Sequence, residues 1–198
     1  MINTKKGLTT TSKVLIGVGI FVLILIFWFI GSYNGLVKSD ETVNEKWANV
    51  ESAYQRRADL IPNLVATVKQ YTDYEGEVLT EITQARASIG SASNPQELAA
   101  AGGQLDSALA RLLVVVENYP NLKANENYLS LQDELAGTEN RIKVERDNFN
   151  KAVRDFNIKV RRFPSNIVAS MFDFEQRQSF EAAEGTQNAP QVGEMFNQ

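Results

Sequence analysis

The longest uninterrupted apolar segment of the chain covers residues 14–30 and contains no charged side chain. A helix of this length, at a rise of about 1.5 Å per residue, measures about 26 Å, which is close to the hydrocarbon thickness of a bilayer. Trp28 and Tyr33 stand at its C-terminal end, where aromatic side chains favour the membrane–water interface. The pattern predicts a transmembrane helix over residues 14–33, with Trp28 and Tyr33 as membrane-interface residues.

An apolar segment near the N-terminus can also be a cleaved signal peptide or a buried core helix. A cleaved signal peptide has a shorter apolar core and small residues before its cleavage site, whereas residues 27–30 here are bulky. A buried core helix normally keeps a polar face, and this segment has none. We therefore favour an uncleaved signal anchor.

The charges on either side of the anchor predict its orientation. Lys5, Lys6 and Lys13 precede it, and the acidic residues Asp40 and Glu41 follow soon after it. Positive residues are retained on the cytoplasmic side. The sequence thus predicts a single-pass protein of the cytoplasmic (inner) membrane, with its N-terminus in the cytoplasm and the rest on the extracytoplasmic, or periplasmic, side.

Beyond the anchor, apolar and aromatic residues recur at intervals of three and four, which is typical of a helix that packs against other helices. This stripe runs from Val43 to Ile89 and crosses Pro62, which removes a backbone hydrogen bond and must kink or break a helix. No Gly or Asn stands between Tyr54 and Pro62 to turn the chain. We favour one long kinked helix from Asp40 to Ile89 over a helical hairpin at Pro62, and the pattern leaves the hairpin open.

Two further helices are predicted. Asn94 and Pro95 supply an N-cap and a first helical residue for a helix that ends before Tyr119. The last helix extends from near Leu122 to Arg162, and its large apolar residues recur every seven positions, at Leu135, Ile142, Phe149, Phe156 and Phe163. No segment alternates as a strand would. The predicted fold is all-α, an antiparallel bundle of three to four long helices resembling a four-helix bundle.

These patterns divide the chain into five segments. We expect a cytoplasmic stub at residues 1–13, the anchor at 14–33 and the helical bundle at 34–164. A short apolar helical extension follows at 165–183, with apolar side chains at Ile167, Val168, Met171, Phe172 and Phe174. Residues 184–198 are polar, contain Gly and Pro, and have the composition of a disordered tail.

Composition narrows the function further. The part beyond the anchor carries all 24 acidic residues and all but three of the 20 basic ones, and an acidic domain argues against nucleic acid as a partner. The chain contains no Cys and no His, which excludes thiolate chemistry and a Ser-His-Asp triad. Phosphate-binding glycine loops and serine nucleophile motifs are also missing. We expect no enzyme activity and no cofactor.

Three charged residues occupy inward positions of the predicted helices, where apolar residues would be expected. They are Arg57 in the first long helix, and Glu139 and Arg146 in the last. We interpret them chiefly as a structural polar network that fixes helix register. Two alternatives remain: a polar cleft for a ligand, and a metal or hydrolytic site built from carboxylates alone.

Four short blocks of the sequence resemble the signature of the bacterial LemA family. They read YQRRADLIPNLV at residues 54–65, YPNLKA at 119–124, LQDEL at 131–135 and TENRI at 138–142, and Tyr33-Asn34 and Phe149-Asn150 fit the same pattern. The resemblance implies one N-terminal transmembrane helix and a soluble domain like a four-helix bundle, which favours four helices over three. It assigns no catalytic residue.

The function predicted from these features is that of a membrane-anchored extracytoplasmic scaffold or adaptor, acting through helical contacts with proteins. Its partners would be the lipid bilayer, other membrane or envelope proteins and copies of itself, since a long apolar stripe is not covered by one short helix. We therefore expect a homo-oligomer. The alternative is a small-ligand or peptide-binding module using the polar site in the bundle.

Overall fold

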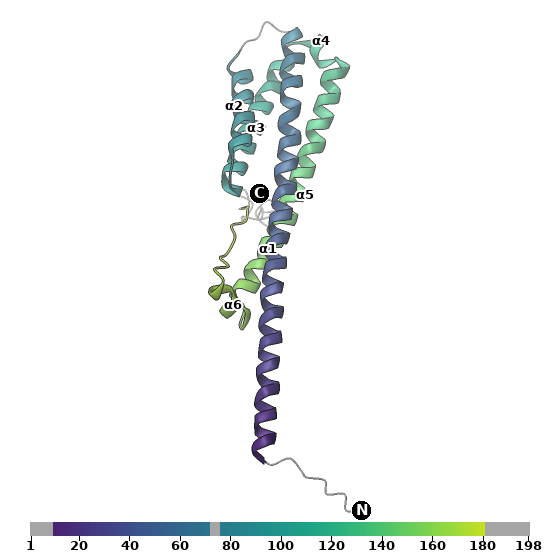
Figure 1. Cartoon of the computed structure of the whole chain (residues 1–198). Coiled ribbons are helices and arrows are strands. Elements are labelled where there is room, and N and C mark those ends of the chain that lie inside the picture. The colour runs from purple at the N-terminus through teal and green to yellow at the C-terminus, as the bar shows by residue number, and fades with distance from the viewer. Residues whose placement is uncertain (1–9, 72–75, 181–198) are drawn as a thin grey trace, which may run out of the picture. The chain divides into compact units, whose positions relative to one another are not determined.

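The computed structural model describes residues 10–71 and 76–180, and its regular elements are six helices (Figure 1). They are α1 (Thr10–Tyr71), α2 (Glu77–Ser91), α3 (Pro95–Val116), α4 (Pro120–Lys123), α5 (Glu126–Arg161) and α6 (Ser165–Met171). No strand occurs in these two described ranges, so the prediction of an all-α chain with an N-terminal apolar helix is confirmed. The predicted tail at 184–198 lies outside the described residues.

The prediction of one continuous helix from Asp40 to Ile89 is wrong about where this helix ends. Helix α1 continues through Pro62 and ends at Tyr71, and α2 begins at Glu77 behind Gly76 as N-cap. The apolar stripe itself is confirmed on both sides of the break, because Val68, Val78 and Ile82 are buried alike. The spacing of apolar residues continued in phase across the break, so it carried no information about the interruption.

Helix α1 tolerates Pro62 because another helix satisfies the carbonyl group that Pro62 leaves without a partner. Proline has no N–H, so the carbonyl oxygen of Ala58, four residues earlier, loses its usual helical donor. The Nε of Arg86 in α2 donates to that oxygen at 3.1 Å. A hydrogen bond between α1 and α2 thus replaces one within α1.

The start of the last long helix also differs from the prediction. The expected helix from Leu122 divides into the single turn α4 and a separate α5 that begins at Glu126. Between them the side-chain oxygen of Asn125 accepts a hydrogen bond from the backbone N–H of Tyr128 at 3.0 Å, which is the action of an N-cap. Asn125 is thus the residue that separates the two helices.

The start of α3 follows the prediction. Asn94 caps the helix by accepting from the N–H of Glu97 at 2.9 Å, and Pro95 occupies the first turn. The Glu97 carboxylate in turn accepts from the backbone N–H and the hydroxyl of Ser93. The arrangement is similar to a capping box, except that Glu97 reaches back to Ser93, the residue before the N-cap, instead of to the N–H of Asn94. Hydrogen bonds from Ser93, with a further one from Asn94, lower the pKa of the Glu97 carboxyl.

The described residues fall into two units. The first comprises residues 10–43 and 154–177, and the second comprises residues 44–71, 76–153 and 178–180. In the second unit, segments of α1, α2, α3 and α5 lie alongside one another (Figure 1). Their fully buried side chains include Val50, Ile61, Leu64, Val68, Ile82, Leu105, Leu112, Tyr128 and Ile142.

In the first unit, the N-terminal part of α1 is apolar and uncovered. Its most apolar 18-residue stretch has a mean hydropathy of 2.9, and none of it is buried, which is consistent with a membrane anchor. Helix α3, in the second unit, also passes the test of length and apolarity for a span, with a lower mean hydropathy of 1.3 and a third of its stretch buried. Of the predicted interface residues, Trp28 is exposed and Tyr33 is half-buried against Phe172, with ring centroids 4.6 Å apart.

Two adjacent glycines of α3 have different structural roles. A Cβ atom added to Gly102 would lie 2.8 Å from Cε1 of Tyr54, whereas one added to Gly103 would meet no atom within 4 Å. The Tyr54 ring is buried and cannot swing away freely. Gly102 therefore permits the close approach of α3 to Tyr54 of α1, and Gly103 contributes only a lower helix propensity.

We expect Gly102→Ala to lower the unfolding temperature of the full chain in mild detergent, and Gly103→Ala to raise it. Alanine at either position gains about 0.5–1 kcal/mol of helix propensity. At Gly102 this gain is exceeded by overpacking against Tyr54, which costs about 1–3 kcal/mol. Thermal unfolding followed by circular dichroism measures both variants, and shifts of the same sign would contradict the assigned roles.

Candidate functional site

The most unusual side chain of the second unit is Arg57, a guanidinium that is only 6% exposed. It lies on α1 at an inward position of the heptad stripe, as the sequence predicts. An ionised group removed from water is costly unless it is paired and hydrogen-bonded. Arg57 therefore needs counter-charges close by.

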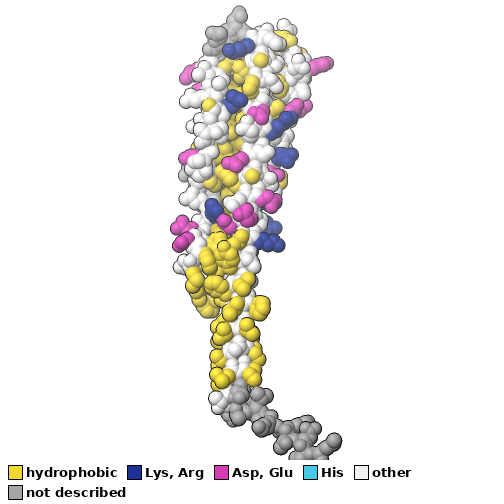
Figure 2. All heavy atoms as spheres, in the orientation of Figure 1, with side chains coloured by type: hydrophobic (Ala, Val, Ile, Leu, Met, Phe, Trp, Pro, Cys, Tyr) yellow, Lys and Arg dark blue, Asp and Glu magenta, His cyan; other side chains and the backbone are white. Residues whose placement is uncertain are grey.

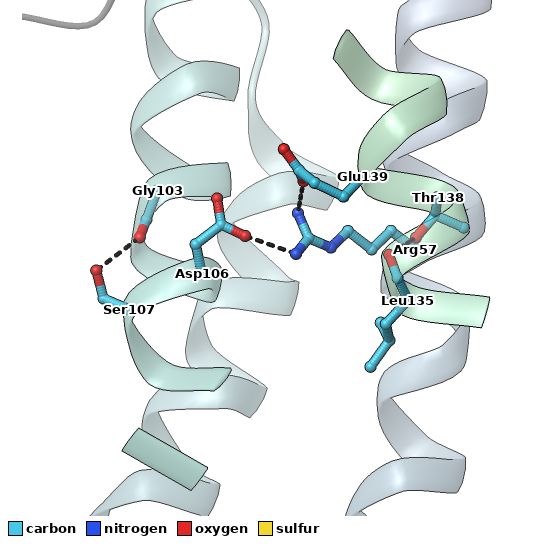
Figure 3. A network of polar contacts seen from close by, with 7 residues as sticks. All are labelled: Arg57, Gly103, Asp106, Ser107, Leu135, Thr138 and Glu139. Atoms are coloured by element: carbon cyan, nitrogen blue, oxygen red, sulfur yellow. Dashed lines mark hydrogen bonds and ion pairs between the residues drawn. The ribbon is translucent and has the colours of Figure 1, made fainter. Parts of the chain in front are cut away.

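Two carboxylates from two other helices meet Arg57 (Figure 3). Its Nη2 lies 2.6 Å from Oδ1 of Asp106 in α3, and its Nη1 donates to Oε2 of Glu139 in α5. Both carboxylates are half exposed to solvent. One buried cation thus joins α1, α3 and α5, and the three groups together carry a net charge of −1.

The predicted polar residues are only partly brought together. The structure places Glu139 beside Arg57, but it places Arg146 elsewhere, with its guanidinium carbon 4.6 Å above the ring centroid of Phe180. This is a cation–π contact, and no ion pair joins Arg146 to Glu139 in the part of the chain that the structure describes. Phe180 is itself buried and packs against Trp47 and Phe149.

Asp106 is the site residue that the sequence pattern did not reveal. Its neighbour Leu105 lies in the apolar stripe of α3, while Asp106 lies beside the stripe and reads as an ordinary solvated position. Only indirect evidence in the sequence pointed to an acidic partner for Arg57. An inward arginine needs counter-charges on facing helices, but the sequence does not show which of the 24 acidic residues supplies them.

A cavity of about 450 Å³ adjoins Arg57 and Asp106. It is lined mainly by apolar side chains of α3 and α5, with Tyr128, Gln132 and Asp133 among its polar members. The Tyr128 hydroxyl accepts a hydrogen bond from Gln132 at 3.1 Å, and burial raises the pKa of Tyr128. The Nε of Arg57 is buried and has no hydrogen-bond partner among the described residues.

The groups around this site can be described by their charge and protonation. Burial is the main cause of the raised pKa of Tyr54. The hydroxyl of Tyr54 therefore stays protonated near neutral pH. No group of three or more acidic residues able to hold a metal ion occurs among residues 10–71 and 76–180. The arrangement offers an apolar hollow whose lining includes the acidic residues Asp106 and Asp133.

Comparisons with known proteins cover most of the chain. A family model described as the LemA family matches residues 46–193. The chain is 28% identical over 187 residues to Protein LemA of Metamycoplasma hominis, across 91% of this chain and 84% of that protein.

Two further relatives are longer proteins. The chain is 27% identical over 175 residues to Magnetosome protein MamQ 2 of Paramagnetospirillum magneticum. It is 25% identical over 174 residues to Magnetosome protein MamQ of Magnetospirillum gryphiswaldense. Each match covers 75% of this chain and spans 64% of the magnetosome protein.

We expect the two carboxylates around Arg57 to act redundantly. Asp106→Asn or Glu139→Gln alone leaves the buried cation with one counter-ion at a half-exposed position, and should lower the free energy of unfolding by about 1 kcal/mol. The double variant leaves an unpaired buried charge, which should cost about 3–5 kcal/mol in total. Urea unfolding of the full chain in mild detergent measures this non-additivity.

The exposed ion pair between Arg56 and Glu134, 3.3 Å apart, supplies the control for this cycle. Glu134→Gln should change the free energy of unfolding by no more than about 0.5 kcal/mol and add simply to Glu139→Gln. Additive effects of Asp106→Asn and Glu139→Gln would contradict a shared role around Arg57.

Proposed function

This chain belongs to the LemA family, and we propose that it is a membrane-anchored scaffold that acts through helical contacts with proteins, including copies of itself. We further propose that the four helical segments of the second unit form an antiparallel bundle outside the cytoplasm. The uncovered apolar stretch of α1 and the lysines before it support the anchor and its orientation.

The observation that carries the scaffold proposal is the composition of the C-terminal half of α3. Residues 112–116 are an unbroken run of leucine and valine, and a helix that buries one face needs such residues only on that face. Leu112 and Val116 are buried, whereas Leu113 and Val114 are 47% and 64% exposed. The exposed pair supplies an apolar surface for a partner helix.

A second copy of this chain is the partner that the anchor favours. Chains held in one membrane are confined to two dimensions and oriented alike, which raises their effective concentration without any new contact. A symmetric pairing through the same helix would bury the exposed residues of both copies at once. Other membrane or envelope proteins with a complementary apolar helix fit the same surface.

A second candidate function is the binding of a small ligand or peptide in the cavity beside Arg57. The lining of this cavity favours it, because it is mainly apolar with a few polar side chains such as Tyr128 and Gln132, as is usual for ligand pockets. Apolar walls and acidic lining residues would suit an apolar ligand rather than an anion. Val114 is not part of the cavity wall, so a change at Val114 separates the two functions.

We expect the full chain in mild detergent to form an oligomer that Val114→Glu dissociates. A carboxylate buried in an apolar contact between copies carries a large desolvation cost. Light scattering after size exclusion at micromolar concentration measures the mass. The matched control is Gln104→Glu, which adds the same charge at another exposed position of α3 and should leave the mass unchanged. A monomeric parent chain would reject self-association.

The proposed orientation predicts which residues a membrane-impermeant maleimide can reach. Since the chain contains no Cys, single cysteines report without background. Ser107→Cys, exposed on α3, should be labelled on intact spheroplasts, whereas Thr4→Cys in the stub should be labelled only after the membrane is opened. The reverse pattern would contradict the orientation.

A further inference from the structure

Helix α6 is apolar on two opposite sides. On one side, Val168 and Ala169 are buried with Leu36 of α1, and Tyr33 and Phe174 pack around them. On the other side, large apolar residues point away from this core. A helix of this composition in water would leave an unfavourable surface, so the outward side requires a partner.

Exposed large apolar residues lie on α6 (Ile167 and Met171), shortly before it (Phe163) and directly after it (Phe172). Phe163, Ile167 and Met171 follow one another at intervals of four and are 74%, 51% and 61% exposed, and Phe172 beside them is 45% exposed. No residue between 163 and 172 is charged. We call Phe163, Ile167, Met171 and Phe172 the α6 strip.

Aromatic contacts place the α6 strip at the end of the membrane anchor. The ring centroid of Phe172 lies 6.0 Å from that of Phe29 and 4.6 Å from that of Tyr33. Phe29 belongs to the uninterrupted apolar segment 14–30, and Tyr33 belongs to the turn that follows it. Phe172 is therefore level with the last turn of the apolar segment, at the depth where hydrocarbon gives way to headgroups.

The apolar surface continues from the anchor onto this region. Figure 2 shows the hydrophobic side chains of the N-terminal part of α1 extending without a charged interruption to a broader hydrophobic area above it. Because the hydrophobic area is continuous, the partner of the α6 strip should be apolar, as the lipid around the anchor is. A lipid bilayer that surrounds the anchor would therefore also contact the α6 strip.

Charged residues at the start of the strip fit the same partner. Arg161 and Arg162, immediately before Phe163, are exposed, and neither forms an ion pair with another residue in the described ranges. By contrast, Arg177 of the same unit is held by Asp40 at 2.9 Å. Guanidinium groups beside an apolar strip suit the phosphate groups of lipids.

We propose that α6 is an interfacial helix, whose strip enters the headgroup and upper acyl-chain region of the same phospholipid bilayer that α1 spans. This inference rests on the proposed membrane anchor and adds a second attachment to it. A lone span can rotate about its axis and tilt. A lateral helix packed on Phe29 and Tyr33 fixes one rotational setting of α1, because only one face of α1 carries α6.

The absence of Cys in the chain makes a depth measurement direct. Single cysteines replace Ile167, Met171, Leu25 within the span, or Ser107 on α3, and each carries an environment-sensitive NBD fluorophore. The full chain is reconstituted in vesicles of phosphatidylethanolamine and phosphatidylglycerol. Parallel vesicle sets contain lipids with a nitroxide quencher on the headgroup, high on the acyl chain or deep on the acyl chain.

We expect the probes at positions 167 and 171 to show blue-shifted emission and to lose most intensity with the headgroup and shallow nitroxides. The probe at position 25 should be quenched most by the deep nitroxide, and the probe at position 107 by none. A further variant, Asn166→Cys, places the probe on an exposed polar residue of the same short helix and should be quenched less than position 167. This comparison controls for attraction of the fluorophore itself to lipid.

Each remaining outcome is decisive. Blue-shifted emission at 167 and 171 without nitroxide quenching would overturn the proposal in favour of a protein partner, including a second copy. Unshifted emission at both positions with normal quenching at position 25 would overturn it and leave the anchor intact. Loss of quenching at position 25 as well would overturn the anchor, and the second attachment with it.

Discussion

A buried guanidinium must have its counter-charges close by, and in this chain that requirement links three helices. Arg57 is the only basic residue among the buried side chains of the described ranges, and its carboxylate partners come from α3 and α5. Apolar packing alone tolerates a helix that slides or rotates by a fraction of a turn, whereas an ion pair at contact distance does not. The charged contact thus specifies register for a core whose other buried side chains are mainly apolar.

A second polar contact also positions α1, at the residue next to Arg57. Pro62 removes a donor from α1, and the Arg86 guanidinium supplies the missing hydrogen bond to Ala58 from α2. Arg57 and Ala58 are neighbours in the sequence, so α1 is fixed to α2 at one residue and to α3 and α5 at the next. The proline, which weakens α1 considered alone, becomes part of the contact that positions α2. The glycine at position 102 adds a third constraint nearby, since it lets α3 approach the ring of Tyr54.

The sequence predicted what depends on local spacing and missed what depends on partners. The helical class, the apolar N-terminal segment and the Asn94-Pro95 helix start all follow from the order of residues along short stretches of the chain, and all are found. The break after Tyr71 was missed, because apolar residues resume in phase at Val78. Arg57 stood out as a polar residue at an inward position. Its partner Asp106 did not, because an acidic residue beside an apolar stripe looks the same whether it faces water or an arginine on another helix.

The two exposed apolar surfaces call for different partners, and the charges around each decide which. The α3 surface at Leu113 and Val114 follows Arg111, which is paired with Glu81 at 2.6 Å, and precedes Glu117. Insertion into lipid would carry these charges along at a cost of several kcal/mol (about 2.5–3.5 for each central charge), so a protein surface with a polar rim suits it better. The α6 strip lies within ten consecutive uncharged residues, 163–172, and charged residues stand only at its edges, with Arg161 and Arg162 before it and Asp173 after it. Lipid accepts that pattern without removing any charge from water. The positions of the charged residues along the two helices therefore distinguish the proposed protein-binding surface from the proposed membrane-binding surface.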